Sequence, residues 1–82
     1  MSVWSVYILR CADDTLYTGI APDVQKRLEK HNAGKGAKYT RGRGPVTLVY
    51  QAEFPNRAEA SKEEYRIKHL SRPEKLLLIE GK

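Results

Sequence analysis

Two stretches near the N-terminus decide the fold: Val-Trp-Ser-Val-Tyr-Ile-Leu (residues 3–9) and Thr-Leu-Tyr-Thr-Gly-Ile (residues 15–20). Both are rich in β-branched and aromatic residues and are separated by Ala-Asp-Asp, which predicts a β-hairpin. Burying the apolar residues of both strands on one face requires residues of equal parity to lie opposite each other. A three-residue connection that pairs Cys11 with Thr15 meets this condition. The apolar residues are Trp4, Val6, Ile8, Leu16 and Ile20.

This register predicts where the two tyrosines of the hairpin lie. Tyr7 falls opposite Gly19, and Tyr17 falls opposite Leu9. Both phenols then share the other face of the hairpin as diagonal neighbours, roughly 7–8 Å apart at the backbone. Gly19 has no side chain, so we expect space beside the Tyr7 ring.

The rest of the chain predicts one more strand and three helices. Pro22 suits the first turn of a helix that runs to about Asn32, where Gly34 and Gly36 end it. Asn56 can cap a second helix. The remaining predicted elements are a strand over residues 46–52, the second helix over 57–70 and a short third helix over 73–79.

The composition describes one globular domain spanning residues 1–82. Hydrophobic residues make up 40% of the chain and charged residues 30%, which is unlike a disordered tail. A chain this short has little room for an internal cavity, so a ligand should bind across its surface. The single Cys11 excludes an internal disulfide and fits a reducing cytoplasm. No apolar run is long enough to span a membrane, and no secretory signal is visible.

The net charge of +5 is concentrated in the middle of the chain. Residues 22–44 hold seven bases against two acids, which is typical of a protein with a phosphate-bearing partner. The alternative is a basic surface that serves only solubility. Within this segment, residues 33–44 contain four glycines and Tyr39, and they predict a mobile cationic loop. The expected nucleic-acid contacts are Lys26, Lys35, Lys38, Tyr39, Arg41 and Arg43.

Three more side chains suggest chemistry. Arg27 and His31 lie one helical turn apart beside an apolar line. Glu64 interrupts the inward stripe of the second helix, and a buried carboxylate is costly unless a cation or donors compensate it. Each has an ordinary reading: solvated helix residues, or an ion pair of Glu64 with Lys68. Together with the two phenols they suggest a groove that handles a phosphate.

These residues resemble the GIY-YIG nuclease superfamily. The resemblance rests on Val6-Tyr7-Ile8, on Tyr17-Thr18-Gly19, on Arg27-x-x-x-His31 and on the inward Glu64. The string from residue 31 to 49 is similar to that of small stand-alone bacterial members, often called YhbQ-like. The resemblance implies an α+β fold in which a three-stranded antiparallel sheet is flanked by about three helices. It also implies metal-dependent hydrolysis of a DNA phosphodiester.

The resemblance also implies roles for five catalytic residues. Tyr7 would be the general base that deprotonates the attacking water, and Tyr17 would position that water. Arg27 would hold the scissile phosphate, and His31 would orient or tune Tyr7. Glu64 would bind Mg²⁺ or Mn²⁺. Since a free phenol has a pKa near 10, we expect Tyr7 to need cationic neighbours that favour its phenolate.

Three functions remain open. The leading hypothesis is a DNA endonuclease guided by branched, single-stranded or otherwise aberrant structure and linked to DNA repair or processing. The second is a catalytically weak or inactive nucleic-acid-binding module. It is suggested by Ser5, which replaces the glycine of the first motif, and by Ile20 after the second. The third is a small domain that docks on a larger repair or ribonucleoprotein complex through an unknown protein partner.

Overall fold

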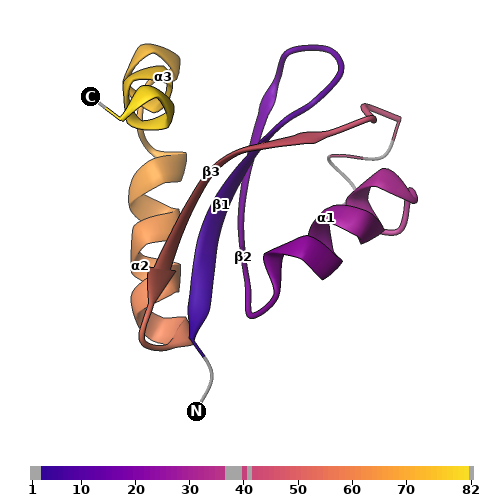
Figure 1. Cartoon of the computed structure of the whole chain (residues 1–82). Coiled ribbons are helices and arrows are strands. Elements are labelled where there is room, and N and C mark those ends of the chain that lie inside the picture. Colours follow the sequence, from indigo (N-terminus) through magenta and orange to yellow (C-terminus); the bar gives the residue numbers. More distant parts are fainter. Residues whose placement is uncertain (1–2, 37–39, 41, 82) are drawn as a thin grey trace.

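The computed structural model describes residues 3–36, 40 and 42–81. Its strands form an antiparallel sheet in the order β2-β1-β3. Helix α1 lies on one side of this sheet, and α2 and α3 lie on the other (Figure 1). The predicted α+β class is confirmed, and no described helix is long and apolar enough to cross a membrane. The elements are β1 (Trp4–Arg10), β2 (Leu16–Ala21), α1 (Val24–Asn32), β3 (Thr47–Phe54), α2 (Arg57–Lys68) and α3 (Arg72–Glu80).

The hairpin has the register that its apolar pattern predicts. Tyr7 pairs with Gly19, and Leu9 pairs with Tyr17. The backbone N–H of Cys11 donates to the carbonyl oxygen of Thr15 at 2.8 Å, which closes the three-residue connection. Residues of equal parity therefore lie opposite each other, as burial of one apolar face requires.

The two faces of the sheet support two apolar clusters. On one face, Val6 and Ile8 pack against Ala60 and Ile67 of α2, and all four are fully buried. On the other face, the cluster belongs to the odd residues of β1 and to α1. It consists of Tyr7, Leu9, Cys11, Ala21, Val24 and Val46. Tyr7 thus lies in the layer between the sheet and α1, and Tyr17 packs against the same cluster.

Capping side chains set where the helices begin. The Asp23 carboxylate accepts from the backbone N–H of Lys26 at 3.1 Å, so α1 begins at Val24. Pro22 therefore precedes the cap and does not occupy the first turn, contrary to expectation. Asn56 caps α2 as predicted, with its side chain accepting from the backbone N–H of Glu59 at 2.9 Å. The other predicted ends shift by one or two residues.

Hydrogen bonds link both ends of the loop between α1 and β3 to neighbouring parts of the fold. The Asn32 side chain accepts from the backbone N–H of Val46 at 2.7 Å and donates to its carbonyl oxygen at 3.3 Å. The Arg43 carbonyl oxygen accepts from the backbone N–H of Ala12 at 2.7 Å. The Arg43 guanidinium also pairs with Asp13. These contacts attach the loop to the hairpin.

Candidate active site

Strands β1 and β2 place two tyrosine rings beside each other under α1. The ring centroids of Tyr7 and Tyr17 are 6.4 Å apart, and Tyr7 is only 1% exposed. A Cβ atom placed on Gly19 would lie 2.7 Å from the Tyr7 hydroxyl oxygen. The space expected beside Gly19 is therefore filled by the Tyr7 ring itself, and no larger residue would leave that ring in place.

Helix α1 adds an imidazole to this pair. His31 is 2% exposed, and its Nε2 lies 3.1 Å from the Tyr7 hydroxyl oxygen, within hydrogen-bonding distance. The ring centroids of Tyr17 and His31 are 5.3 Å apart. Buried Tyr7 and His31 and half-buried Tyr17 thus form one cluster, which brings together three of the five predicted catalytic residues.

The far side of the imidazole meets the loop between α1 and β3. His31 Nδ1 lies 2.8 Å from Thr40 Oγ1, and Thr40 is 1% exposed. A Cβ atom on Gly36 would overlap the His31 ring. Gly36 therefore lets the loop pass closely enough for Thr40 to reach the ring, and both imidazole nitrogens are hydrogen-bonded.

Burial controls the protonation of this cluster. Burial is the largest cause of the raised pKa of the Tyr7 phenol, and Tyr17 raises this pKa further. The Arg27 guanidinium lowers the same pKa, and the Glu64 carboxylate raises it. Burial also lowers the pKa of His31, and the charge of Arg27 lowers it further. Arg27 favours the Tyr7 phenolate, as expected of a cationic neighbour, but among the described residues desolvation outweighs it.

Glu64 approaches the cluster from α2. Its side chain is 22% exposed, and its Oε2 lies 3.2 Å from Nζ of Lys68. This is the ordinary ion pair that the spacing of four residues allows. The carboxylate is nevertheless close enough to Tyr7 to raise the pKa of that phenol. The charge of Glu64 therefore acts on Tyr7, and Lys68 balances part of that charge.

The donor set can be tested against the predicted divalent ion. Within the described part of the chain, no three His, Cys, Asp or Glu side chains gather into a metal cluster. Mg²⁺ suits such a site, because it keeps several waters and binds one or two carboxylates together with substrate phosphates. Zn²⁺ does not suit it, because zinc sites use three or four protein ligands. Glu64 therefore fits Mg²⁺ or Mn²⁺, and its carboxylate would leave the ion pair with Lys68 to bind the ion.

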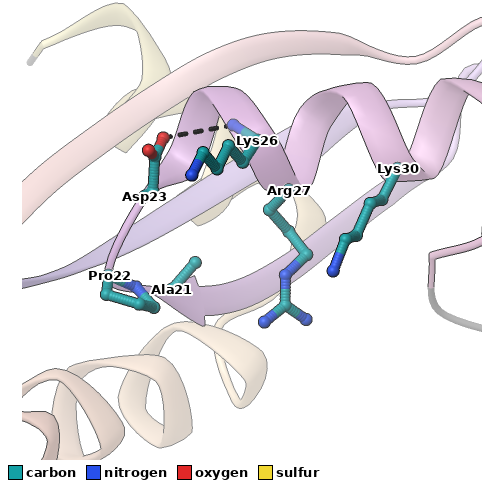
Figure 2. A pocket seen from close by; sticks show the side chains of 6 residues that line it. All are labelled: Ala21, Pro22, Asp23, Lys26, Arg27 and Lys30. Atoms are coloured by element: carbon teal, nitrogen blue, oxygen red, sulfur yellow. Dashed lines mark hydrogen bonds between the residues drawn. The ribbon is translucent and has the colours of Figure 1, made fainter.

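Arg27 borders a shallow hollow of about 170 Å³ at the surface of α1. In Figure 2, the guanidinium of Arg27 and the ammonium of Lys30 point to the same side of the helix. The basic groups of this hollow are suited to a phosphate, which Arg can bind through two parallel hydrogen bonds. The residues lining the hollow are Ala21, Pro22, Asp23, Lys26, Arg27 and Lys30.

The predicted nucleic-acid contacts separate into three groups. Lys26 and Lys35 line a neighbouring hollow on α1, together with Lys30. Arg43 lies on the hairpin side of the loop, in the ion pair with Asp13. The third group falls outside the described residues: Lys38, Tyr39 and Arg41.

Two residues of the site were missed from the sequence. Lys30 lies three residues after Arg27 and four after Lys26, so helical spacing could have placed it on the same basic face. Thr40 carried no such signal, because it lies in an irregular loop nine residues from His31. Only the folded loop brings its hydroxyl to the imidazole.

The chain matches the family model described as the GIY-YIG catalytic domain over residues 3–76. It is 60% identical over 75 residues to the UPF0213 protein OB0043 of Oceanobacillus iheyensis, which covers 92% of this chain and 87% of that protein. It is 57% identical over 74 residues to the UPF0213 protein VNG_2274C of Halobacterium salinarum, and this match covers 90% of this chain and 96% of that protein.

Solved structures give the same result. The solution NMR structure of the UPF0213 protein BH0048 from Bacillus halodurans is 52% identical, with a TM-score of 0.64, and the match covers 98% of this chain and 85% of that chain. The solution NMR structure of EF2693 from E. faecalis is 34% identical, with a TM-score of 0.62, and the match covers 95% of this chain and 88% of that chain. The chain belongs to the GIY-YIG family, which is a nuclease superfamily.

Proposed function

We propose that this protein is a metal-dependent endonuclease that hydrolyses a DNA phosphodiester bond. The observation that carries the proposal is the hydrogen-bonded chain from Tyr7 through His31 to Thr40. It lies beside Tyr17 and within the electrostatic influence of Arg27 and Glu64. A protein that only bound nucleic acid would not need a buried path for a proton.

The raised pKa of Tyr7 favours a relay over a free phenolate. The attacking water gives a proton to the Tyr7 oxygen while the Tyr7 hydroxyl proton passes to Nε2 of His31. Tyr7 is then a neutral phenol before and after the step, and the charge appears on the imidazole. His31 is suited to receive the proton, because its lowered pKa keeps it neutral at pH 7.

The other residues hold the substrate. Arg27 grips the scissile phosphate in two parallel hydrogen bonds, and the hydroxyl of Tyr17 helps to position the water. The water oxygen bonds to phosphorus as the bond to the 3′ oxygen breaks, and that oxygen takes a proton from solvent. Glu64 would hold Mg²⁺ or Mn²⁺, which would supply charge stabilisation for the phosphate and for this leaving oxygen.

The basic face of α1 extends the contact to neighbouring phosphates. Lys26, Lys30 and Lys35 line its hollows, and contacts of this kind give affinity that depends on salt and not on sequence. We propose that DNA structure or a partner protein directs the enzyme to its target, as in DNA repair or processing.

The test is a cleavage panel of single-stranded, duplex, nicked, flapped and branched DNA with RNA controls. Wild-type protein should nick at least one DNA with Mg²⁺ or Mn²⁺. Glu64→Gln should lose roughly 100-fold or more of the rate while DNA affinity stays within about twofold, because it removes the metal ligand and no phosphate contact. The matched control is Glu59→Gln, another α2 carboxylate paired with a lysine, Lys62. Binding without cleavage by wild type under every condition would favour the binding module.

A further inference from the structure

Thr40 belongs to no strand or α-helix, yet its side chain is among the most buried of the described residues. Its hydroxyl lies against Nδ1 of His31 at 2.8 Å. Gly36 permits this approach, because any side chain at that position would overlap the imidazole. Two described residues of the loop between α1 and β3, Gly36 and Thr40, therefore both lie against the His31 ring.

A neutral imidazole carries its proton on only one nitrogen, and the partner of one nitrogen decides the state of the other. Nε2 of His31 faces the Tyr7 hydroxyl at 3.1 Å. If Nε2 carries the proton, it can only donate to the Tyr7 oxygen, and it cannot receive the hydroxyl proton of that phenol. If Nδ1 carries the proton, Nε2 has a free lone pair that accepts from the Tyr7 O–H.

We infer that Thr40 is a positioning residue that accepts the Nδ1–H of His31 and so holds the lone pair of Nε2 toward Tyr7. Its importance for cleavage rests on the proposed function, since it makes His31 the acceptor at the end of the proton relay. A phenol is a stronger donor to an imidazole nitrogen than it is an acceptor, so the Tyr7 O–H and the Thr40 oxygen favour the same tautomer.

The chain carries its own reference for this assignment. It contains two histidines, His31 and His69. His69 Nδ1 lies 2.8 Å from the backbone carbonyl oxygen of Tyr65. A carbonyl oxygen can only accept, so Nδ1 of His69 must carry a proton. A spectrum of the imidazole nitrogens therefore holds two sets of signals, one from each histidine, and the tautomer of His69 is known.

The experiment records the ring ¹⁵N resonances of wild type, Thr40→Val and Thr40→Ser at about pH 8, above the ordinary imidazole pKa near 6.5. Wild-type His31 should show the Nδ1–H pattern of His69. Thr40→Val keeps the shape of the side chain but cannot accept, so His31 should shift toward the Nε2–H pattern while His69 stays unchanged. Thr40→Ser keeps the hydroxyl and should keep the wild-type tautomer.

Cleavage rates of the same three proteins complete the test. Thr40→Val should cut about 10- to 100-fold more slowly, less than the roughly 10⁴-fold that a wrong tautomer costs in serine proteases. Thr40→Ser should restore most of the rate. The inference would be overturned if wild-type His31 showed the Nε2–H tautomer, or if Thr40→Val left the tautomer of His31 unchanged. Either result decides the matter whatever the cleavage rates of the variants are. A changed tautomer with an unchanged rate would overturn the role in cleavage. If wild type cuts nothing, the proposed function fails and the spectra alone decide the assignment of Thr40.

Discussion

Gly19→Ala perturbs the candidate active site by the addition of one methyl group. The new Cβ would lie 2.7 Å from the Tyr7 hydroxyl oxygen, 2.8 Å from Cζ of the same ring and 3.1 Å from Cε2 of Tyr17. Ordinary van der Waals contact begins at 3.4 Å. The Tyr7 oxygen must therefore move by about 0.7 Å, the difference between 3.4 and 2.7 Å, or the strand must shift by a similar amount.

A movement of this size along the line between the two atoms breaks the hydrogen bond to His31. The Tyr7 oxygen and Nε2 are 3.1 Å apart, so a shift of about 0.7 Å along their line leaves them about 3.8 Å apart or crowds them to about 2.4 Å. Neither separation supports the proton relay. We expect the rate of cleavage to fall roughly 100-fold, the scale of a misplacement near 1 Å in an active site.

The same methyl group should cost little stability. Overpacking a buried ring costs about 1–3 kcal/mol, and replacing glycine by alanine returns about 0.4–1 kcal/mol by restricting the unfolded chain. We therefore expect the free energy of unfolding to fall by about 0–2.6 kcal/mol. The domain should remain folded, so that the loss of rate reports geometry.

The assay combines single-turnover nicking, DNA affinity by fluorescence anisotropy and urea unfolding. Gly44→Ala is the matched control, because a Cβ at Gly44 meets nothing within 4 Å, and it should leave all three quantities unchanged. Gly19→Ala should change the nicking rate and leave the affinity near that of wild type. Nicking at the wild-type rate by a folded Gly19→Ala protein would refute the claim that the position of Tyr7 limits the reaction.

Three further predictions follow from the charges of the site. Lys30→Gln should weaken DNA binding and lower the magnitude of the slope of log affinity against log salt by about 1. The control Lys62→Gln, on the exposed side of α2, should change neither quantity. Equal slopes for wild type and Lys30→Gln would show that Lys30 does not contact DNA. Folding lowers the pKa of His31, so the unfolded chain binds the proton first as pH falls. The free energy of unfolding, measured in urea, should therefore drop below about pH 6.5. The His31→Asn variant should lack this drop, which lies well above the range where carboxylates titrate. The cleavage rate should level off near neutral pH once His31 is neutral; a tenfold rise per pH unit continuing into the alkaline range would indicate a free Tyr7 phenolate instead.

The hairpin could be predicted from sequence because its information is local and periodic. Side chains alternate between faces with a period of two, so the even-numbered apolar residues fixed the register and placed Tyr7 opposite Gly19. Helical spacing likewise placed His31 on the side of α1 that meets the sheet, whereas Arg27 is exposed and borders the surface hollow. The shifts at the element ends come from capping: Asp23 takes the cap position, which puts Pro22 outside α1.

The loop and the protonation of the site could not be predicted in this way. Arg43 pairs with Asp13 across thirty positions of the chain, and no periodicity links a glycine-rich loop to a hairpin turn. The pKa of Tyr7 depends on how much water the folded layers exclude, which the sequence does not give. The sequence identified Arg27 as a cation that acts on Tyr7 but had no measure of the desolvation that outweighs it.

In the proposed mechanism, Arg27 would connect substrate binding to the proton acceptor. Its charge is one of the two causes that lower the pKa of His31, so the free protein holds a weakly basic imidazole beside Tyr7. A phosphate bound to Arg27 neutralises much of that charge and adds negative charge of its own, both of which favour a protonated imidazole. His31 thus becomes a better proton acceptor when the scissile phosphate is in place and remains a poor one when it is not. In the proposed mechanism, the guanidinium that would grip the substrate therefore also ties the strength of the base to the presence of the substrate, which a phenolate maintained by the protein alone would not do.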